Sequence, residues 1–336
     1  MKTYGWGILG PGRIAHRFLN DLPRCEQAGL AAVASRDLER ARSFAGQYGF
    51  RKAYGSYGEL LQDPDVAIVY VATPHPQHAE LVQQALEAKK AVLCEKPVAV
   101  NGRQARQMVA SAAENRQFFM EAMWTRFFPV NRQVKALITS GALGAVTLIE
   151  VDFGFGNWPH GPVDHPESRI YAPQLAGGSL LDVGVYCVSY ATWMKGERPT
   201  AIKALSTRVS TGVDGMTAAL FQYRDGAMAV LRSSVIQATR LTATIYCEKA
   251  TVEVPDFYHP EQAIVRSRSG DVEDQVIRAL YSANGATGFD FDARELMRCL
   301  DEGLLESPLM TWQQSVVVMD LLDEIRQDIG LIFPMD

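Results

Sequence analysis

Residues 4–18 read YGWGILGPGRIAHRF, and this stretch decides the fold of the first part of the chain. The apolar run Tyr4–Leu9 has the length of a strand, the loop Gly10-Pro11-Gly12 follows it at once, and a helical pattern begins near residue 12. A Gly-x-Gly-x-x-Ala loop between a buried strand and a helix is typical of dinucleotide-binding Rossmann domains. The alternative interpretation is a strand-to-helix turn that binds no ligand.

Each residue type in this loop suits a pyrophosphate. Gly10 can make the tight turn, Gly12 lets the backbone approach the phosphates, and Ala15 permits close packing of the helix on the strand. The first N–H groups of a helix have no partner within it and carry a partial positive charge, so they can bind an anion without a lysine. We therefore predict that the cofactor contacts Gly10, Gly12, Arg13 and Ile14.

The pattern of residues 1–123 predicts a parallel sheet. Short continuous apolar runs alternate with longer periodic stretches, as in βαβ units whose strands are covered on both faces. We expect strands at 4–9, 30–34, 66–72, 91–94 and 118–120, and helices at 12–20, 37–48, 77–88 and 102–115. This region is predicted to be an α/β Rossmann domain.

Residues 124–336 have a different character and are predicted to form a second, α+β domain. A helix is expected from Pro129 to about residue 140, and two further helices at 290–303 and 311–328. Between them, alternating segments separated by turn signals predict a large, mostly antiparallel open sheet, at 146–155, 201–209, 217–223, 227–235 and 241–246. A bare sheet face needs covering, so we predict that this domain binds substrate and forms a homo-oligomer, a dimer.

Composition narrows the class of protein. With 336 residues, 47% hydrophobic and 21% charged, the chain has ordinary globular composition and a length that favours two domains. A net charge of −5 favours neither nucleic acid nor an anionic membrane surface as a partner. The five cysteines are scattered, which favours neither disulfides nor a zinc site. We expect no secretory signal and no membrane span, and predict a cytoplasmic protein.

The end of the second predicted strand favours NADP over NAD. An NAD site usually places an acidic residue there for the ribose 2′-hydroxyl. This chain has Ser35 and Arg36, with Arg40 one helical turn on, a set that suits a 2′-phosphate through charge-assisted hydrogen bonds. The alternative is a solvated helix start in which Asp37 and Glu39 pair with the arginines.

Two further strand ends carry the residues with chemistry. The strand at 66–72 is followed by Thr73-Pro74-His75 and His78, and the strand at 91–94 by Glu95-Lys96-Pro97. Ligands bind outside the carboxyl ends of strands in such sheets, so the Lys96 ammonium is expected near the nicotinamide, where it can stabilise an alkoxide. We predict that Thr73, Pro74, His75, His78, Glu95, Lys96 and Pro97 contact the cofactor. The His-Pro-Gln-His spacing alone favours a loop structure, and no metal is predicted.

Together the glycine loop, Ala72-Thr73-Pro74 with His78, and Glu95-Lys96-Pro97 resemble the Gfo/Idh/MocA oxidoreductase family, for which Glu-Lys-Pro is the most specific mark. The segments 121–127, 177–186 and 329–334 look like the dimeric dihydrodiol dehydrogenase branch, whose similarity runs over essentially the whole chain. The resemblance implies a Rossmann domain, an antiparallel sheet domain often used for oligomerisation, and a substrate held between the two.

The residues Asp182 to Tyr186 depart from the wider family pattern. Many members carry a histidine four residues after the aspartate, whereas this chain has Tyr186. The branch that it resembles uses tyrosine and the Glu-Lys-Pro lysine as a proton-transfer pair, which implies that role for Tyr186 and Lys96. A neighbouring ammonium favours a phenolate, and Asp182, on the same helix face, can orient the substrate or the lysine. The alternative for Tyr186 is core packing.

Aromatic and basic residues supply candidates for substrate contact. Aromatic walls suit a ring substrate or a sugar face, and core filling is the alternative for each of Trp124, Phe153, Phe155 and Trp158. Arg126 and Arg169 lie in segments placed near the site, although surface or interface arginines look the same in sequence. The residues predicted to bind substrate are Trp124, Arg126, Phe155 and Arg169.

The main hypothesis is an NADP-dependent enzyme that moves a hydride between nicotinamide and the hydroxyl or carbonyl carbon of a sugar or cyclic trans-diol. A second is an NADPH-dependent reductase of keto or aldehydo sugars, which differs in reaction direction. A third, from another class, is a catalytically silent dinucleotide sensor or scaffold, because a fold alone does not establish an activity. Retention of Lys96 and Tyr186 favours the enzymes.

Overall fold

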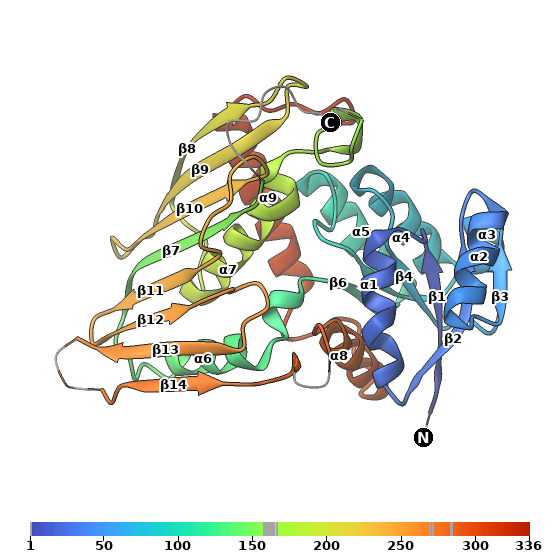
Figure 1. Cartoon of the computed structure of the whole chain (residues 1–336), viewed down its shortest axis with the longest axis horizontal. Helices are drawn as coiled ribbons and strands as arrows, with labels where there is room; N and C mark the ends of the chain where they lie inside the picture. The colour runs from blue at the N-terminus through green and yellow to red at the C-terminus, as the bar shows by residue number, and fades with distance from the viewer. Residues whose placement is uncertain (1, 157–164, 166, 269, 271, 283–284) are drawn as a thin grey trace. The chain divides into compact units, whose positions relative to one another are not determined.

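The computed structural model describes residues 2–156, 165, 167–268, 270, 272–282 and 285–336. It divides into two compact units, one made of Met1–Trp124 with Tyr281–Val316 and the other of Thr125–Leu280 with Val317–Asp336. The predicted division into 1–123 and 124–336 differs in that residues 281–316 return to the first unit. Figure 1 traces the chain from the N-terminus in blue to the C-terminus in red.

The first unit contains a six-stranded parallel sheet in the order β3-β2-β1-β4-β5-β6. Its strands are β1 (Tyr4–Leu9), β2 (Ala28–Ala34), β3 (Lys52–Tyr54), β4 (Ile68–Val71), β5 (Ala91–Cys94) and β6 (Phe119–Glu121). Its helices are α1 (Arg13–Asp21), α2 (Leu38–Tyr48), α3 (Tyr57–Leu61), α4 (His78–Glu87), α5 (Gly102–Asn115) and α8 (Asp290–Asp301). The predicted Rossmann sheet is confirmed, with β3 and α3 as additional elements.

Local sequence explains why these helices start where they do. The Asp37 side chain accepts hydrogen bonds from the N–H groups of Glu39 and Arg40 and so caps α2. Ser56 and Glu59 form a reciprocal capping box on α3. The central strands are continuous apolar runs because helices cover them: every residue of β4 and β5 is buried.

The second unit contains an eight-stranded sheet in the order β14-β13-β12-β11-β7-β10-β9-β8. Its strands are β7 (Val146–Gly154), β8 (Ala201–Arg208), β9 (Asp214–Gln222), β10 (Met228–Ser234), β11 (Ala243–Cys247), β12 (Ala250–Val254), β13 (Gln262–Ser267) and β14 (Gln275–Arg278). Among the described strands of this second sheet, only the central pair β7–β10 is parallel. The predicted mostly antiparallel sheet is therefore confirmed.

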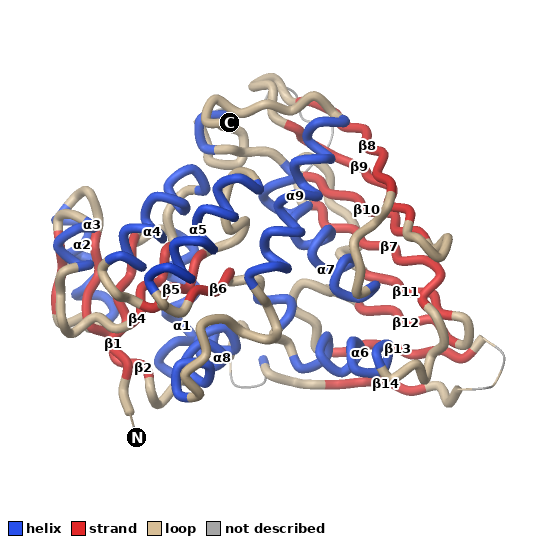
Figure 2. Tube along the Cα trace, turned by 180° about the vertical axis from the view of Figure 1, so that it is seen from behind, coloured by secondary structure: helices blue, strands red, loops and turns tan. Residues whose placement is uncertain are grey.

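The helices of this unit cover one face of its sheet. They are α6 (Pro129–Thr139), α7 (Val185–Lys195) and α9 (Trp312–Asp328), which starts in the first unit and continues into the second. Figures 1 and 2 show α6 and α7 on the same side of the sheet from opposite viewpoints. On β9 buried and exposed residues alternate, with Met216 and Leu220 among the exposed ones. The opposite face therefore presents apolar side chains that no described helix covers.

Candidate active site

The predicted cofactor loops follow three adjacent parallel strands of the first unit. Because β1, β4 and β5 are neighbours, the loops at their carboxyl ends share one edge of the sheet. Gly10 has φ +90°, and a Cβ there would lie 2.9 Å from Cγ2 of Thr73, so glycine is needed where the two loops meet. Gly12 is the N-cap of α1 and gives that helix no side-chain cap, while the Arg13 side chain is exposed and Ile14 is half-buried. The N-terminal N–H groups of α1 can therefore receive a phosphate.

The end of β2 carries the residues predicted to select NADP. The Ser35 hydroxyl is buried and accepts from the N–H of Asp37, whose carboxylate caps α2. Arg36 and Arg40 are exposed, and Nη2 of Arg40 donates to the carbonyl oxygen of Pro11 at 3.0 Å. Arg40 thus links the glycine loop to this corner, and Asp37 is engaged with the helix.

Tyr57 lies beside the same two arginines, although the sequence analysis did not select it. Burial raises the pKa of its phenol, and the positive charges of Arg36 and Arg40 oppose that rise. Tyr57 is the first residue of α3, an element too short for the hydrophobic pattern to predict. The helix-start signature Ser56-x-x-Glu59 could have located it.

His78 joins the loops after β4 and β5. Its ring is fully buried, with Nδ1 2.9 Å from the carbonyl oxygen of Pro97 and Nε2 2.9 Å from that of Thr73. Burial lowers the pKa of His78, while its hydrogen bonds to backbone carbonyls oppose the shift. The imidazole therefore fixes the Glu-Lys-Pro loop against the Thr-Pro-His loop, in which His75 is also buried and Pro74 half-buried.

Lys96 is the second residue after β5 and is half-buried, and its peptide bond to Pro97 is cis. The neighbouring Glu95 is buried and accepts hydrogen bonds from the Tyr70 hydroxyl and the backbone N–H of Lys96. Glu95 thus holds the backbone from which the Lys96 side chain extends.

A second buried carboxyl, Asp292 of α8, acts on the same corner of the first unit. It is 1% exposed, and its Oδ1 has no hydrogen-bond partner among the described residues. Burial, together with the negative charges of Glu95 and Asp290, raises the pKa of Asp292 well above its usual range. Its surroundings therefore favour the neutral form more than water does, a feature that was not predicted from sequence.

Asp182 and Tyr186 belong to the second unit, where they lie four residues apart on a buried helical segment. Asp182 lies in a π-helical turn, Leu180–Gly184, which runs directly into α7. Its carboxylate Oδ1 is 2.9 Å from Nη1 of Arg169, whose side chain is partly exposed. The structure thus brings together two residues that were predicted separately, one as catalytic and one as substrate-binding. π-Helical turns occur frequently at functional sites.

Tyr186 belongs to a cluster of aromatic rings within this unit. Phe153 stacks on Tyr186 with ring centroids 5.4 Å apart, and the ring centroid of Tyr258 lies 4.4 Å from that of Phe153. Phe155 is half-buried two residues along the chain. Tyr258, at the turn after β12, was not selected from sequence because an isolated aromatic in a loop carries no pattern. Trp158 lies outside the described residues.

The two remaining predicted substrate residues have well-defined surroundings. Trp124 is buried in the first unit, where it stacks on Phe289 at 4.5 Å. Arg126 is 1% exposed in the second unit, with Nε 3.2 Å from the hydroxyl oxygen of Ser189 and its guanidinium over the ring of Trp193. Arg126 supports α7 by these contacts, and substrate binding by either residue stays a prediction.

No group of three or more His, Cys, Asp or Glu side chains among the described residues has the arrangement of a metal site. No described helix combines the length and apolarity needed to cross a bilayer. All five cysteines are buried thiols.

Comparison with known proteins gives matches over nearly the whole chain. Residues 4–123 match the family model described as an oxidoreductase family with an NAD-binding Rossmann fold, and residues 131–253 match the GFO/IDH/MocA C-terminal domain. Proteins named trans-1,2-dihydrobenzene-1,2-diol dehydrogenase from Xenopus tropicalis and Homo sapiens are each 36% identical over 336 residues. These alignments cover 98% of this chain and 99% and 98% of those proteins. A solved structure of a 3-ketoreductase from Actinomadura kijaniata, in complex with NADP and TDP-benzene, is 25% identical with a TM-score of 0.84 and 98% coverage of both chains.

Proposed function

Because the chain belongs to the Gfo/Idh/MocA oxidoreductase family, we propose that it is an NADP-dependent enzyme acting on a sugar or cyclic trans-diol. The single observation that carries the proposal is the common edge of the parallel sheet, where the glycine loop, Thr73 and Lys96 follow the ends of adjacent strands. The full-length likeness to trans-dihydrodiol dehydrogenases supports the substrate class.

The preference for NADP rests on the corner after β2. Arg36 and Arg40 supply two guanidinium groups, Ser35 supplies a hydroxyl, and the carboxylate of Asp37 is engaged in capping α2. This donor set fits a 2′-phosphate better than a 2′-hydroxyl. The 3-ketoreductase from Actinomadura kijaniata, which was solved with NADP, supports the same choice.

In the proposed reaction the cofactor supplies the hydride chemistry, and the protein moves the proton. During oxidation Tyr186 takes the proton of the substrate hydroxyl, and the Lys96 ammonium stabilises the negative charge that develops on its oxygen. Asp182, held by Arg169, orients the reacting group. In reduction the same residues act in reverse, with Tyr186 as the proton donor.

The substrate is proposed to lie against aromatic surfaces. Phe153 and Tyr258 extend the ring of Tyr186 into an aromatic cluster in the second unit. Such a surface suits the face of a cyclic diol or of a sugar ring. Trp124, Phe155, Arg126 and Arg169 remain proposed contacts.

The test is a direct assay of purified protein. NADP is mixed with aldoses, inositols and cyclic trans-diols, NADPH is mixed with keto and aldehydo sugars, and the nicotinamide absorbance is followed. Turnover of a hydroxyl substrate with NADP is expected. Turnover of carbonyl substrates alone would favour the reductase, and binding of NADP without any turnover would favour the silent sensor.

The open sheet face is proposed to form a homodimer interface. Its exposed apolar residues are Leu205, Met216, Leu220, Met228 and Val276. The strand register places Leu220 between Lys203 and Val230 on this face. Sedimentation should show a dimer that Leu220→Lys weakens and that Leu304→Lys, a similarly exposed leucine of the first unit, leaves intact. A monomeric wild-type protein would refute the interface.

The cytoplasmic location also remains a proposal.

A further inference from the structure

A buried carboxylate, Asp214, meets the start of the helical segment that carries Asp182 and Tyr186. Asp214 begins β9 and is fully buried in the second unit. We propose that Asp214 is a positioning residue, which holds the beginning of this segment so that Asp182 and Tyr186 are presented in a fixed geometry. The inference rests on the proposed function, in which these two residues serve the proton transfer.

The contacts of Asp214 concentrate on the beginning of the segment. Its Oδ2 accepts hydrogen bonds from the Ser179 hydroxyl at 2.7 Å, the Leu180 backbone N–H at 2.7 Å and the Thr217 hydroxyl at 2.8 Å. Ser179 also lies 3.1 Å from the hydroxyl of Ser233 on β10. Asp214 thus accepts from both a side-chain and a backbone donor at the N-terminus of the π-helical turn, and these bonds oppose the rise in its pKa that burial causes.

The Gly177-Gly178 pair explains how the chain admits this carboxylate. Gly178 has φ +112°, and a Cβ there would lie 2.1 Å from Oδ1 of Asp214. A Cβ on Gly177 would lie 2.6 Å from the carbonyl oxygen of Ile170, the residue after Arg169. Glycine at both positions lets Asp214 approach from one side and the turn bearing Arg169 from the other. Asp214, which accepts from the helical turn, and the segment of Arg169, which pairs with Asp182, therefore both approach this glycine pair.

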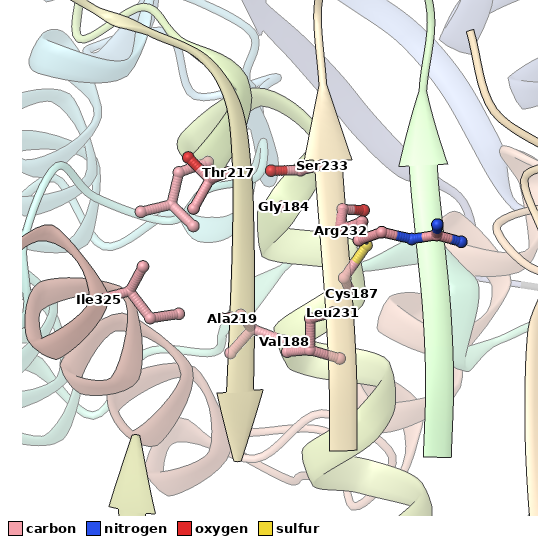
Figure 3. Close-up of a pocket in the computed structure, with 10 residues that line it drawn as sticks. Gly184, Cys187, Val188, Thr217, Ala219, Leu231, Arg232, Ser233 and Ile325 are labelled. Carbon is pink, nitrogen blue, oxygen red and sulfur yellow. Dashed lines mark hydrogen bonds between the residues drawn. The ribbon is translucent and has the colours of Figure 1, made fainter. Parts of the chain in front are cut away.

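Packing beneath the segment leaves a small cavity. A cavity of about 10 Å³, with room for about one water molecule, lies between the helical segment, β9, β10 and α9. Figure 3 shows Thr217 and Ser233 on the strands beside Gly184 of the helical segment, with Ile325 of α9 opposite. Because apolar contact is incomplete here, the hydrogen bonds to Asp214 carry more of the constraint on the helix.

A shift at the start of the segment would reach the reacting groups. Tyr186 lies six residues after Leu180, about 9 Å along a helix. Displacement of a catalytic group by about 1 Å can lower a rate about a hundredfold. Asp214 itself touches neither substrate nor cofactor in this proposal, so its effect should appear in kcat and not in cofactor affinity.

The kinetic test compares Asp214→Asn and Ser179→Ala with a matched buried carboxylate. Asp63 of the first unit also accepts from three donors, the Lys52 ammonium, the Tyr54 hydroxyl and the Asp65 N–H, so Asp63→Asn is the control. We expect kcat per folded protein to fall about tenfold in Asp214→Asn and about threefold in Ser179→Ala. The KM for NADP should stay within about twofold, and Asp63→Asn should keep the wild-type kcat.

Tyr186→Phe is measured in parallel so that two failures can be told apart. If Tyr186→Phe loses turnover while both Asp214→Asn and Ser179→Ala keep kcat within about twofold, the positioning role is overturned and the proposed function stands. If Tyr186→Phe keeps full turnover, the proposed function fails, and the positional claim is decided by amide hydrogen exchange.

That exchange measurement needs no substrate. Amides of residues 180–190 should exchange at least about tenfold faster in Asp214→Asn than in wild type, and at the wild-type rate in Asp63→Asn. Equal exchange of this segment in wild type and Asp214→Asn would overturn the inference.

Discussion

Two helical segments of the molecule each begin just after a pair of closely spaced glycines. They differ in what their N-terminal N–H groups contact. Before α1, Gly12 is the N-cap, and no side chain among the described residues caps the helix. Before the segment that leads into α7, Gly178 lies against the carboxylate of Asp214, which accepts from the N–H of Leu180. The first N-terminus can receive an anion from outside, whereas the second is closed by a carboxyl group of the protein itself.

The same backbone feature, the free N–H groups at a helix N-terminus, can therefore serve two purposes. An open N-terminus is a binding site, since its N–H groups exchange water for a ligand phosphate. A closed N-terminus is a fixed support, since its partner is built into the fold. We expect substitutions at the first to change cofactor affinity and substitutions at the second to change stability and turnover.

The largest expected effect is on turnover at the closed segment. Tyr186→Phe removes the hydroxyl proposed to move the proton and should lower kcat about 100-fold to 10,000-fold. The affinity for NADP, measured by fluorescence titration, should not change. The matched control is Tyr190→Phe, one helical turn on, whose hydroxyl bonds only Asn131 among the contacts described for it. Comparable losses in both variants would point to helix disruption instead of proton transfer.

The open N-terminus could be predicted from sequence because its signals are local. Gly10, Gly12 and Lys96 all lie within a few residues of a strand end, where the parallel sheet fixes what they face. The short elements β3 and α3 show no hydrophobic period, since they have only three and five residues, and the capping box of α3 is the local signal that was overlooked.

The closed N-terminus depends on contacts that no local pattern encodes. Asp214 and Ser179 are 35 residues apart in sequence, and Arg169 meets Asp182 only because the glycine pair lets two segments approach. In the same way, the return of residues 281–316 to the first unit follows from tertiary packing, and their helical pattern predicts only that a helix forms there.

The next effect concerns stability of the closed segment. Gly178→Ala adds a Cβ within 2.1 Å of the Asp214 carboxylate at a positive φ, and should cost about 2–4 kcal/mol of unfolding free energy. Gly212→Ala, also at a positive φ but with open space around the new Cβ, should cost only about 1 kcal/mol. Urea unfolding measures both. Equal costs would mean that the carboxylate does not enforce glycine at 178.

A smaller effect is expected at the open N-terminus and its 2′-phosphate corner. Arg36→Ala should raise the KM for NADP about tenfold and leave the KM for NAD within about twofold, because only NADP has the phosphate. Arg42→Ala is the control, since this exposed arginine of α2 pairs with Glu39. Steady-state kinetics with both cofactors make the comparison, and equal changes for NADP and NAD would contradict the assignment.

The smallest effect concerns a second buried acid, Asp292, whose pKa is raised by burial, as is that of Asp214. A raised folded-state pKa means that the folded protein favours neutral Asp292, so its stability contribution falls as pH rises above about 4, the unfolded value. Asp292→Asn stays neutral and should raise Tm by about 2 °C at pH 8 relative to wild type, with little difference at pH 4. Calorimetry at both pH values tests this, and a pH-independent difference would argue against a neutral buried acid.

The central claim is that Lys96 and Tyr186 serve one proton transfer, and a double-mutant cycle tests it most directly. kcat is measured for wild type, Lys96→Met, Tyr186→Phe and the double variant, with NADP binding checked in each. If the two residues act as one unit, the double variant should be no more than about threefold slower than the slower single variant. Multiplication of the two single losses, or full activity in either single variant, would contradict the account.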